Sequence, residues 1–175
     1  YKVTGVQTCA LPICADSRKV AIGLNTVDTG FFSRETEKAR RALSGHSDQK
    51  HLLSIGYLSP RKNMMQLLRI MKSLQALRQD LVLDIVGDGD QRKELECFAT
   101  ENGLTASVVF QGYQQREQLP PLMAASSIFL FQTDFDIWGL VLNEAMAAGL
   151  PVICRSEEHT SELQSPCNLV CRLLL

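Results

Sequence analysis

The stretch HLLSIGYLSPRKNMMQLLRIMKSLQALRQDLVLDIV, residues 51–86, decides the fold of this chain. Its two ends, residues 52–55 and 81–86, are short apolar runs typical of buried strands. Between them, apolar side chains recur at the three-four spacing of an amphipathic helix, at Met64, Leu67, Leu68, Met71, Leu74 and Leu77. A strand, a helix and a second strand in this order predict a right-handed crossover between parallel strands.

The same alternation continues toward residue 153. It predicts three more strands, at residues 107–110, 128–131 and 151–153, and three more helices, at residues 91–102, 117–125 and 140–148. Pro120 and Pro121 fit if they lie in the first turn of their helix, where a missing amide hydrogen does no harm. The pattern predicts an α/β fold, a Rossmann-like doubly wound parallel sheet with helices on both faces. Residues 15–45 are less regular and are interpreted as an initial strand, a loop and a charged helix around residues 34–43.

The two ends of the chain share an origin that the genetic code exposes. One DNA string encodes residues 155–165 on one strand and residues 3–13 on the other strand, in a shifted frame. That string resembles a short-read sequencing-library adapter, whose next segment encodes residues 168–175. Processing and cloning scars are excluded from fold reasoning. We therefore expect residues 1–13 and 155–175 to be adapter-derived and residues 14–154 to form an incomplete domain; the alternative is a genuine polar connector that ends in an amphipathic segment.

Composition restricts the class of protein. A net charge of -1 over 175 residues favours neither a nucleic-acid nor a membrane-surface role. Outside the predicted adapter segments and their junction, Cys97 and Cys154 make neither a redox motif nor a metal site, and Cys97 is expected to be a small core residue. No apolar run is long enough to span a bilayer. The sequence predicts a cytoplasmic domain without nucleic-acid partners, and leaves peripheral membrane association of a longer parent protein open.

The chemistry is expected in the loops that follow the strands, because ligands of open parallel sheets bind at the carboxyl ends of strands. Distinctive residues gather in three such loops, at residues 56–62, 87–90 and 134–139. Gly139 lets the backbone approach a ligand closely, and the amides of Leu140 and Val141 open the following helix. Free amides and the positive end of a helix together make a phosphate site.

Two carboxylates flank this predicted phosphate site. Glu144 lies one turn beyond Leu140, and its side chain leans back toward the start of the helix, where it can accept hydrogen bonds from ribose hydroxyls. Asp136 precedes the same site, so the two acids can bracket a diphosphate, which suits a nucleotide sugar. The alternatives are that Glu144 is stabilised only by the helix dipole and that Asp136 is a helix N-terminal residue without a ligand.

At this point the sequence resembles a known family. The stretch DIWGLVLNEAMAAGLPVI, residues 136–153, resembles the donor-site signature of family 4 (group 1) glycosyltransferases, retaining enzymes of the GT-B fold whose two acids are separated by seven residues. The segments NTVDTGFF, VGDG and FQGY, at residues 25–32, 86–89 and 110–113, extend the resemblance over residues 19–153. It implies the C-terminal donor-binding domain of an enzyme that transfers a hexose from a nucleotide diphosphate sugar with retention, and without a metal or cofactor.

The resemblance also implies the role of each residue. Lys62, supported by Arg61 and the Gly56 loop, would contact the donor diphosphate, and the backbone near Gly112 and Tyr113 would flank the base. The start of the last helix would offer amides to phosphate, Glu144 would hold the ribose and Asp136 would touch the transferred sugar; the helix-start residues are Gly139, Leu140 and Val141. The acceptor domain would precede this one, so this chain alone is expected to be inactive. Many members of the family have Arg where this chain has Tyr57, which puts donor affinity or identity in question.

Other interpretations stay open at this stage. A regulatory module that binds a nucleotide without turnover would share the fold, with Tyr57 as its first sign. An oxidoreductase-type dinucleotide domain would need a G-x-G-x-x-G turn, and residues 87–92 lack the last glycine. Lys62 could also be a solvated surface lysine without a ligand, and Trp138 is expected to pack and shape its loop.

Overall fold

The computed structural model describes residues 27–43, 48–134, 136 and 138–154. In this part of the chain, five parallel strands form one sheet in the order β3-β2-β1-β4-β5. The strands are β1 (Lys50–Ile55), β2 (Leu81–Val86), β3 (Val108–Gly112), β4 (Ile128–Phe131) and β5 (Val152–Cys154). All five predicted strands after residue 50 are therefore confirmed, whereas the initial strand predicted within residues 15–26 lies outside the described residues.

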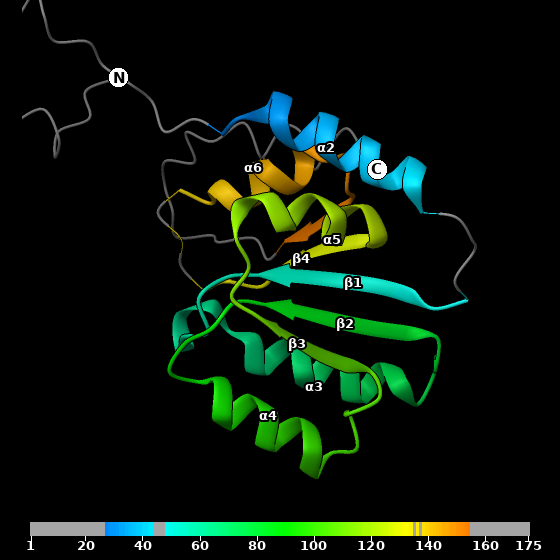
Figure 1. The fold of residues 1–175 in the computed structure, drawn as a ribbon. Helices are drawn as coiled ribbons and strands as arrows, with labels where there is room; N and C mark the ends of the chain where they lie inside the picture. Colours follow the sequence, from blue (N-terminus) through cyan, green and yellow to red (C-terminus); the bar gives the residue numbers. More distant parts are fainter. Residues whose placement is uncertain (1–26, 44–47, 135, 137, 155–175) are drawn as a thin grey trace, which may run out of the picture.

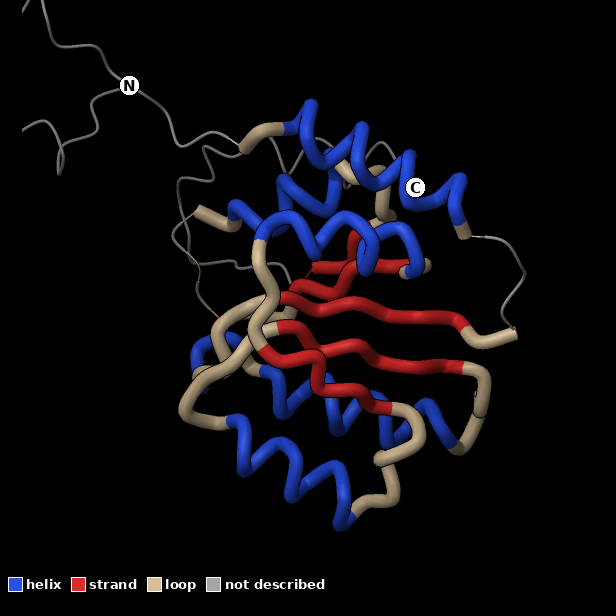
Figure 2. The backbone as a smooth tube through the Cα atoms, viewed as in Figure 1, coloured by secondary structure: helices blue, strands red, loops and turns tan. Residues whose placement is uncertain are grey.

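The helices cover both faces of the sheet, as the doubly wound prediction requires (Figure 1). The lower layer holds α3 (Met64–Gln75) and α4 (Arg92–Glu101), and the upper layer holds α2 (Thr29–Ala42), α5 (Leu119–Ala125) and α6 (Leu140–Ala147). Figure 2 shows the strands as the middle layer between them. The chain moves outward from β1 to β3 and then returns to β4 on the other side of β1. This reversal is a topological switch point, where ligands of such sheets bind.

Each face of the sheet has its own apolar core. Because successive side chains of a strand point to opposite faces, Leu52 packs with α3 and α4 while its neighbour Leu53 packs with α2, α5 and α6. All six residues of β2 are buried, as expected for a central strand covered on both sides. Phe32 of α2 and Phe129 of β4 are fully buried in the upper core. The two cores hold the strand ends in fixed positions below the loops.

A buried carboxylate links three neighbouring strands. Asp84 on β2 is only 6% exposed, and its two oxygens are 2.6 Å from His51 Nδ1 on β1 and 2.8 Å from Gln111 Nε2 on β3. Buried polar groups are normally satisfied in this way. The cluster is therefore explained as part of the sheet.

The helix expected around residues 34–43 is confirmed but begins earlier, at Thr29, because the Asp28 carboxylate accepts a hydrogen bond from the Phe31 amide at 2.9 Å and caps the first turn. Two other local predictions were wrong, and packing explains both. The third helix ends at Gln75, so Leu77 is 80% exposed instead of facing the core. Cys97 lies on the exposed face of α4, since Leu95 and Ala99 fill the core below that helix.

Two glycines let the loops after β1 and β2 pack backbone to backbone. A Cβ on Gly87, whose φ is +136°, would lie 2.0 Å from the carbonyl oxygen of Gly56, and a Cβ on Gly89 would lie 2.5 Å from the carbonyl oxygen of Leu58. The Leu58 amide in turn donates to the Asp88 carbonyl at 2.9 Å. Only glycine fits such contacts. The two loops therefore form one continuous wall at the carboxyl edge of the sheet.

Candidate functional site

A cavity of about 880 Å³ opens at the carboxyl edge of the sheet. Its walls come from the loops after β1, β2, β3 and β4 and from the start of α6. Its lining combines apolar side chains such as Ile55, Val86 and Leu119 with polar groups from several loops. The sequence-predicted site residues among its lining are Gly56, Lys62, Tyr113, Asp136, Leu140, Val141 and Glu144. The fold thus brings together residues that lie up to 88 positions apart in the chain.

Lys62 is held on the inner side of the loop between β1 and α3. It ends a short 3-10 helix, Pro60–Lys62, that Asn63 terminates with a left-handed φ of 52°. The lysine side chain is only 12% exposed, forms an ion pair with Asp136 and lies 5.5 Å from the centre of the Phe131 ring. A cation over an aromatic face is attracted by the ring electrons. The interpretation of Lys62 as a solvated surface lysine is therefore wrong.

Asp136 lies in the loop just before α6, three residues ahead of its N-cap Gly139. One carboxylate oxygen accepts hydrogen bonds from the amides of Trp138 and Gly139, both at 3.2 Å, and the other oxygen binds Lys62. Burial raises the pKa of the Asp136 carboxyl, but Lys62 and the Gly139 and Trp138 amides together outweigh burial and hold its pKa below the ordinary value. The side chain is therefore ionised at neutral pH and makes the contacts of an anion at a helix N-terminus.

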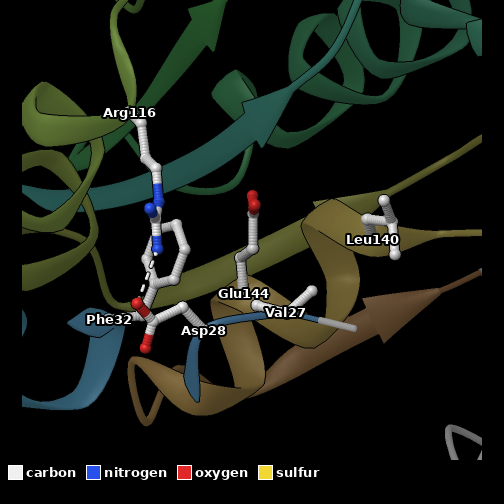
Figure 3. Close-up of a pocket in the computed structure, with 6 residues that line it drawn as sticks. All are labelled: Val27, Asp28, Phe32, Arg116, Leu140 and Glu144. Carbon is white, nitrogen blue, oxygen red and sulfur yellow. Dashed lines mark hydrogen bonds and ion pairs between the residues drawn. The ribbon is translucent and has the colours of Figure 1, made fainter. Parts of the chain in front are cut away.

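Glu144 differs from Asp136 although both line the same cavity. Its half-buried side chain makes no hydrogen bond within the described part of the chain. Burial raises the pKa of its carboxyl, and the positive charge of Arg116 only partly opposes this. Figure 3 shows the carboxylate directed away from α6, at the level of the Arg116 side chain, and Glu144 lines the larger cavity. Both of its oxygens are therefore available to a ligand's hydroxyl groups.

A second cavity, of about 340 Å³, adjoins the first (Figure 3). Leu140 and Glu144 line both cavities. On the far side, Arg116 donates to the Asp28 carboxylate at 3.1 Å and lies over the Phe31 ring at 4.4 Å and the Phe32 ring at 5.6 Å. Arg116 therefore ties the start of α2 to the segment that precedes α5.

The sequence analysis did not predict Asp28 and Arg116 as residues that line the site. Asp28 carried one usable signal, because Asp is a preferred N-cap and residues 28–32 therefore allow a helix start at Thr29. Arg116 carried none, since its partner lies 88 residues away. Gln114 and Leu119 also line the larger cavity and had no motif to mark them, whereas Asp88 lies in the VGDG segment but was given no role.

Some predicted donor-binding residues contribute backbone and do not line either cavity. The Arg61 side chain is exposed, and its carbonyl accepts hydrogen bonds from the Asp134 amide at 2.9 Å and the Thr133 hydroxyl at 3.2 Å. The Gly112 carbonyl accepts from the Gly87 amide at 2.8 Å. Gly139 adopts a φ of 54° as the N-cap of α6. These residues shape the loops around the cavity.

Three exposed aromatic side chains line the larger cavity, namely Tyr57, Tyr113 and Trp138. Trp138 is 52% exposed, so the prediction that it packs within its loop was wrong, and its amide donates to Asp136. Tyr57 is 57% exposed, and its hydroxyl donates to Asp90 at 3.2 Å. It brings no positive charge to the position where the resemblance would place an arginine.

The fold and site define a Rossmann-like domain with a cavity at its switch point, lined by Lys62, Asp136 and Glu144 among others. The family described as "Glycosyl transferases group 1" matches residues 35–165. This match covers more than half of the chain, and the chain belongs to that family. The matched range extends past Cys154, into the segment for which an adapter origin is predicted; that origin stays a prediction.

Individual relatives agree with the family. An uncharacterized glycosyltransferase of Methanocaldococcus jannaschii is 32% identical over 129 residues, which cover 74% of this chain and 33% of that protein. A GDP-mannose-dependent alpha-(1-6)-phosphatidylinositol monomannoside mannosyltransferase of Mycolicibacterium smegmatis is 31% identical over 136 residues, 73% of this chain and 36% of that protein. The chain thus spans about a third of the length of these curated relatives.

Solved structures show the same fold. WaaG, a glycosyltransferase involved in lipopolysaccharide biosynthesis, superposes with a TM-score of 0.57 at 30% identity, over 69% of this chain and 32% of that one. Anabaena HepE, in complex with UDP and glucose, superposes with a TM-score of 0.59 at 25% identity, over 85% of this chain and 41% of that one.

Separately, none of the helices in the described ranges has the length and apolar character needed to cross a bilayer.

Proposed function

We propose that this chain is the C-terminal, donor-binding domain of a family 4 GT-B enzyme that transfers a sugar from a nucleotide diphosphate sugar with retention of configuration. One observation carries the proposal: a single cavity has a lysine and helix-start amides at one place and a carboxylate without a hydrogen bond at another. The first group suits a diphosphate, and the second suits ribose hydroxyls. The HepE structure in complex with UDP and glucose supports this choice of ligand.

The proposed binding mode uses each part of the cavity. Lys62 and the amides at the start of α6 would hold the diphosphate, and Glu144 would accept hydrogen bonds from the ribose. The backbone near Gly112 and Tyr113 would flank the base, and Asp136 would contact the transferred sugar. A volume of about 880 Å³ lies within the range of about 300 to 1,000 Å³ typical of small-molecule sites.

The chemical contribution of this domain would be electrostatic. When the bond between the sugar and the diphosphate breaks, negative charge grows on the leaving phosphate oxygens. Preorganised amides and a partly buried ammonium group stabilise such charge more strongly than water does. Lys62 and the start of α6 would supply this stabilisation without a bound metal. The nucleotide sugar is a substrate here, and the proposal needs no other cofactor.

The acceptor would be bound by another domain of the parent protein. The chain spans about a third of its curated relatives, which supports the idea that further domains take part in turnover. We propose a cytoplasmic parent enzyme, with membrane association left to its other parts, and expect no transfer by residues 14–154 alone.

A second candidate function is a regulatory module that binds a nucleotide without turnover. The observation that favours it is Tyr57, which lies at the cavity with its hydroxyl on Asp90 and supplies no charge to a phosphate. If Tyr57 does not contact the phosphates, the donor's diphosphate would have to be held by Lys62 and the amides at the start of α6. The two candidates agree on the ligand and differ on turnover.

Calorimetric titration tests the shared part of both candidates. The chain is titrated with UDP, GDP, ADP and UMP under identical conditions. We expect at least one nucleoside diphosphate to bind about tenfold more tightly than UMP, because a second phosphate adds charge-assisted hydrogen bonds. No binding of any of the four nucleotides by folded protein contradicts the proposal. Donor hydrolysis by the uninterrupted parent protein then separates the enzyme from the regulatory module.

A further inference from the structure

Three donors beside the larger cavity are already bound to one carboxylate of the protein. The Asp136 carboxylate binds Lys62 with one oxygen and the amides of Trp138 and Gly139 with the other. Lys62 and Trp138 line the larger cavity, and Gly139 is the N-cap of α6. A carboxylate and a phosphate oxygen are both anionic acceptors, so they compete for the same N–H groups.

We propose that Asp136 is an internal stand-in for the donor's diphosphate and makes the site selective for ligands that can displace it. The inference rests on the proposed function and deepens it. In the free protein, Asp136 holds the three donors in place. A diphosphate takes over Lys62 and the two amides, and the Asp136 side chain is released toward the sugar that the same ligand carries.

Geometry makes the two occupants compete at the amides. Each backbone amide has one hydrogen, and the amides of Trp138 and Gly139 already share one Asp136 oxygen. The Lys62 ammonium group has three hydrogens, but its side chain is only 12% exposed and packed over Phe131. A ligand oxygen at either amide must therefore replace the carboxylate there.

Charge decides which ligands succeed. If the ion pair opened without a ligand, Lys62 and Asp136 would each be left as a mostly buried charge without a partner, which is costly. A diphosphate compensates Lys62 with a greater negative charge and more acceptor oxygens than the single carboxylate provides. A nucleoside monophosphate or inorganic phosphate offers less negative charge and fewer acceptor oxygens than a diphosphate. The apparent affinity of every anion is lowered by the fraction of molecules in which Asp136 is still seated.

Release of Asp136 also couples binding to the chemistry. In the free protein its carboxylate is neutralised by Lys62 and directed to the start of α6. Once the diphosphate has replaced it, the carboxylate is available to the hydroxyls of the sugar beside the same phosphate. Asp136 thus would reach its proposed contact with the sugar only when a complete donor is bound. A nucleotide without a sugar would leave the freed carboxylate without its partner.

The experiment compares wild-type chain with Asp136→Asn and Asp136→Ala, using inorganic pyrophosphate and UDP as probes in calorimetric titrations. Asn keeps an acceptor for the two amides but loses the ion pair with Lys62, and Ala loses both. We expect pyrophosphate and UDP to bind about threefold more tightly to the Asn variant and about tenfold or more to the Ala variant. A carboxylate that merely stabilised the loop would give the opposite order, with the Ala variant weakest.

Asp134→Asn is the matched control, because Asp134 belongs to the same loop and carries the same charge but contacts the Asn63 side chain at 3.0 Å. Equal tightening in Asp134→Asn would attribute the effect to general charge and overturn the inference. Unchanged or weaker binding in both Asp136 variants, with UDP bound by wild type, would overturn the inference and leave the proposed function standing. If neither wild type nor the folded variants bind either probe, both fail.

Amide NMR signals supply a second readout. In wild type, pyrophosphate should shift the Trp138 and Gly139 amide signals only slightly, since one anion replaces another. In the Asp136→Ala variant, the free protein should already differ at both amides, and pyrophosphate should move the signals back toward the wild-type positions. Absence of any response of these two amides to saturating pyrophosphate in the Ala variant would overturn the inference.

Discussion

The carboxylates of Asp136 and Glu144 line one cavity, yet their surroundings move their pKa values in opposite directions. Both are partly buried, which raises a carboxyl pKa. Asp136 has Lys62 and two amides as partners, and these outweigh burial. Glu144 has only the more distant charge of Arg116, so burial prevails. The first acid is satisfied in the free protein, and the second keeps its hydrogen-bonding capacity for a ligand.

Glu144→Gln should make the protein more stable and bind nucleotide less well. A carboxyl whose folded pKa is raised stabilises the fold below its unfolded pKa and loses that contribution as the pH rises through the folded pKa. At neutral pH the charge on Glu144 therefore costs stability, and Gln removes that cost. We expect a higher melting temperature at about pH 7 and a smaller difference at about pH 4. UDP affinity should fall about tenfold or more, since charged hydrogen bonds to ribose are lost.

Thermal unfolding at the two pH values and UDP titration measure the two effects of Glu144→Gln. The control is Glu117→Gln, because Glu117 is an exposed acid in the neighbouring 3-10 helix. Glu117→Gln should change neither the melting temperature nor the affinity for UDP. A Glu144→Gln protein that loses stability at neutral pH would contradict the assignment of Glu144 as a ligand-directed carboxylate without an internal partner.

Asp136→Asn should have the reverse effect on stability. A carboxyl whose folded pKa is lowered contributes stability above its unfolded pKa and loses it as the pH falls through the folded pKa. The variant should therefore be less stable than wild type at neutral pH, by about 1 kcal/mol, and the difference should shrink in acid. Urea unfolding at several pH values checks this. A difference that grows as the pH falls would contradict the ion pair with Lys62.

Lys62→Ala should weaken nucleoside diphosphate binding by about tenfold to a hundredfold, because a charge-assisted hydrogen bond to phosphate is worth about 1.5 to 3 kcal/mol. The matched control is Lys72→Ala on α3, where the lysine is exposed and hydrogen-bonds Asn102 at 2.6 Å. Both variants lose one positive charge, and only Lys62 lines the cavity. Equal affinities of the two variants for UDP would argue against a diphosphate at Lys62.

Gly87→Ala should destabilise the fold by about 3 kcal/mol or more, since its Cβ would lie 2.0 Å from the Gly56 carbonyl oxygen at a backbone φ of +136°. Gly56→Ala is the matched control in the facing loop, because a Cβ there meets its nearest atoms at an ordinary 3.7 Å. We expect this second change to alter the unfolding free energy by less than about 0.5 kcal/mol. Denaturant unfolding distinguishes them, and equal losses would show that the two loops do not pack as described.

Trp138 offers a direct probe of ligand binding. It is the single tryptophan of the chain, and its ring is 52% exposed at the mouth of the cavity. A bound nucleotide should remove the ring from water and shift its fluorescence emission to shorter wavelength. Titration with UDP or GDP should give a saturable change, which Lys62→Ala should move to higher concentration. Saturable calorimetric binding without any change in emission would place the ligand away from Trp138.

Much of the architecture could be predicted because local patterns report it. The apolar runs at residues 52–55 and 81–86 and the helical spacing between them appear as β1, α3 and β2. The helix of residues 117–125 became a 3-10 turn followed by α5, with both prolines at its start, as their missing amides require. The ends of the elements were predicted less accurately, since Leu77 continues the apolar spacing of α3 although the helix has already ended.

By itself, the sequence determined the alternation of strands and helices, the location of the loops at one edge and the spacing of the two acids, since each of these is set by neighbouring residues. Only the tertiary structure decided which distant residues form hydrogen bonds and ion pairs with one another. Lys62 meets Asp136 across 74 residues and Arg116 meets Asp28 across 88, because strand order brings distant loops together. The physical reason is that hydrogen bonds and ion pairs depend on distance in space, which the crossover topology and backbone packing at Gly87 and Gly89 fix.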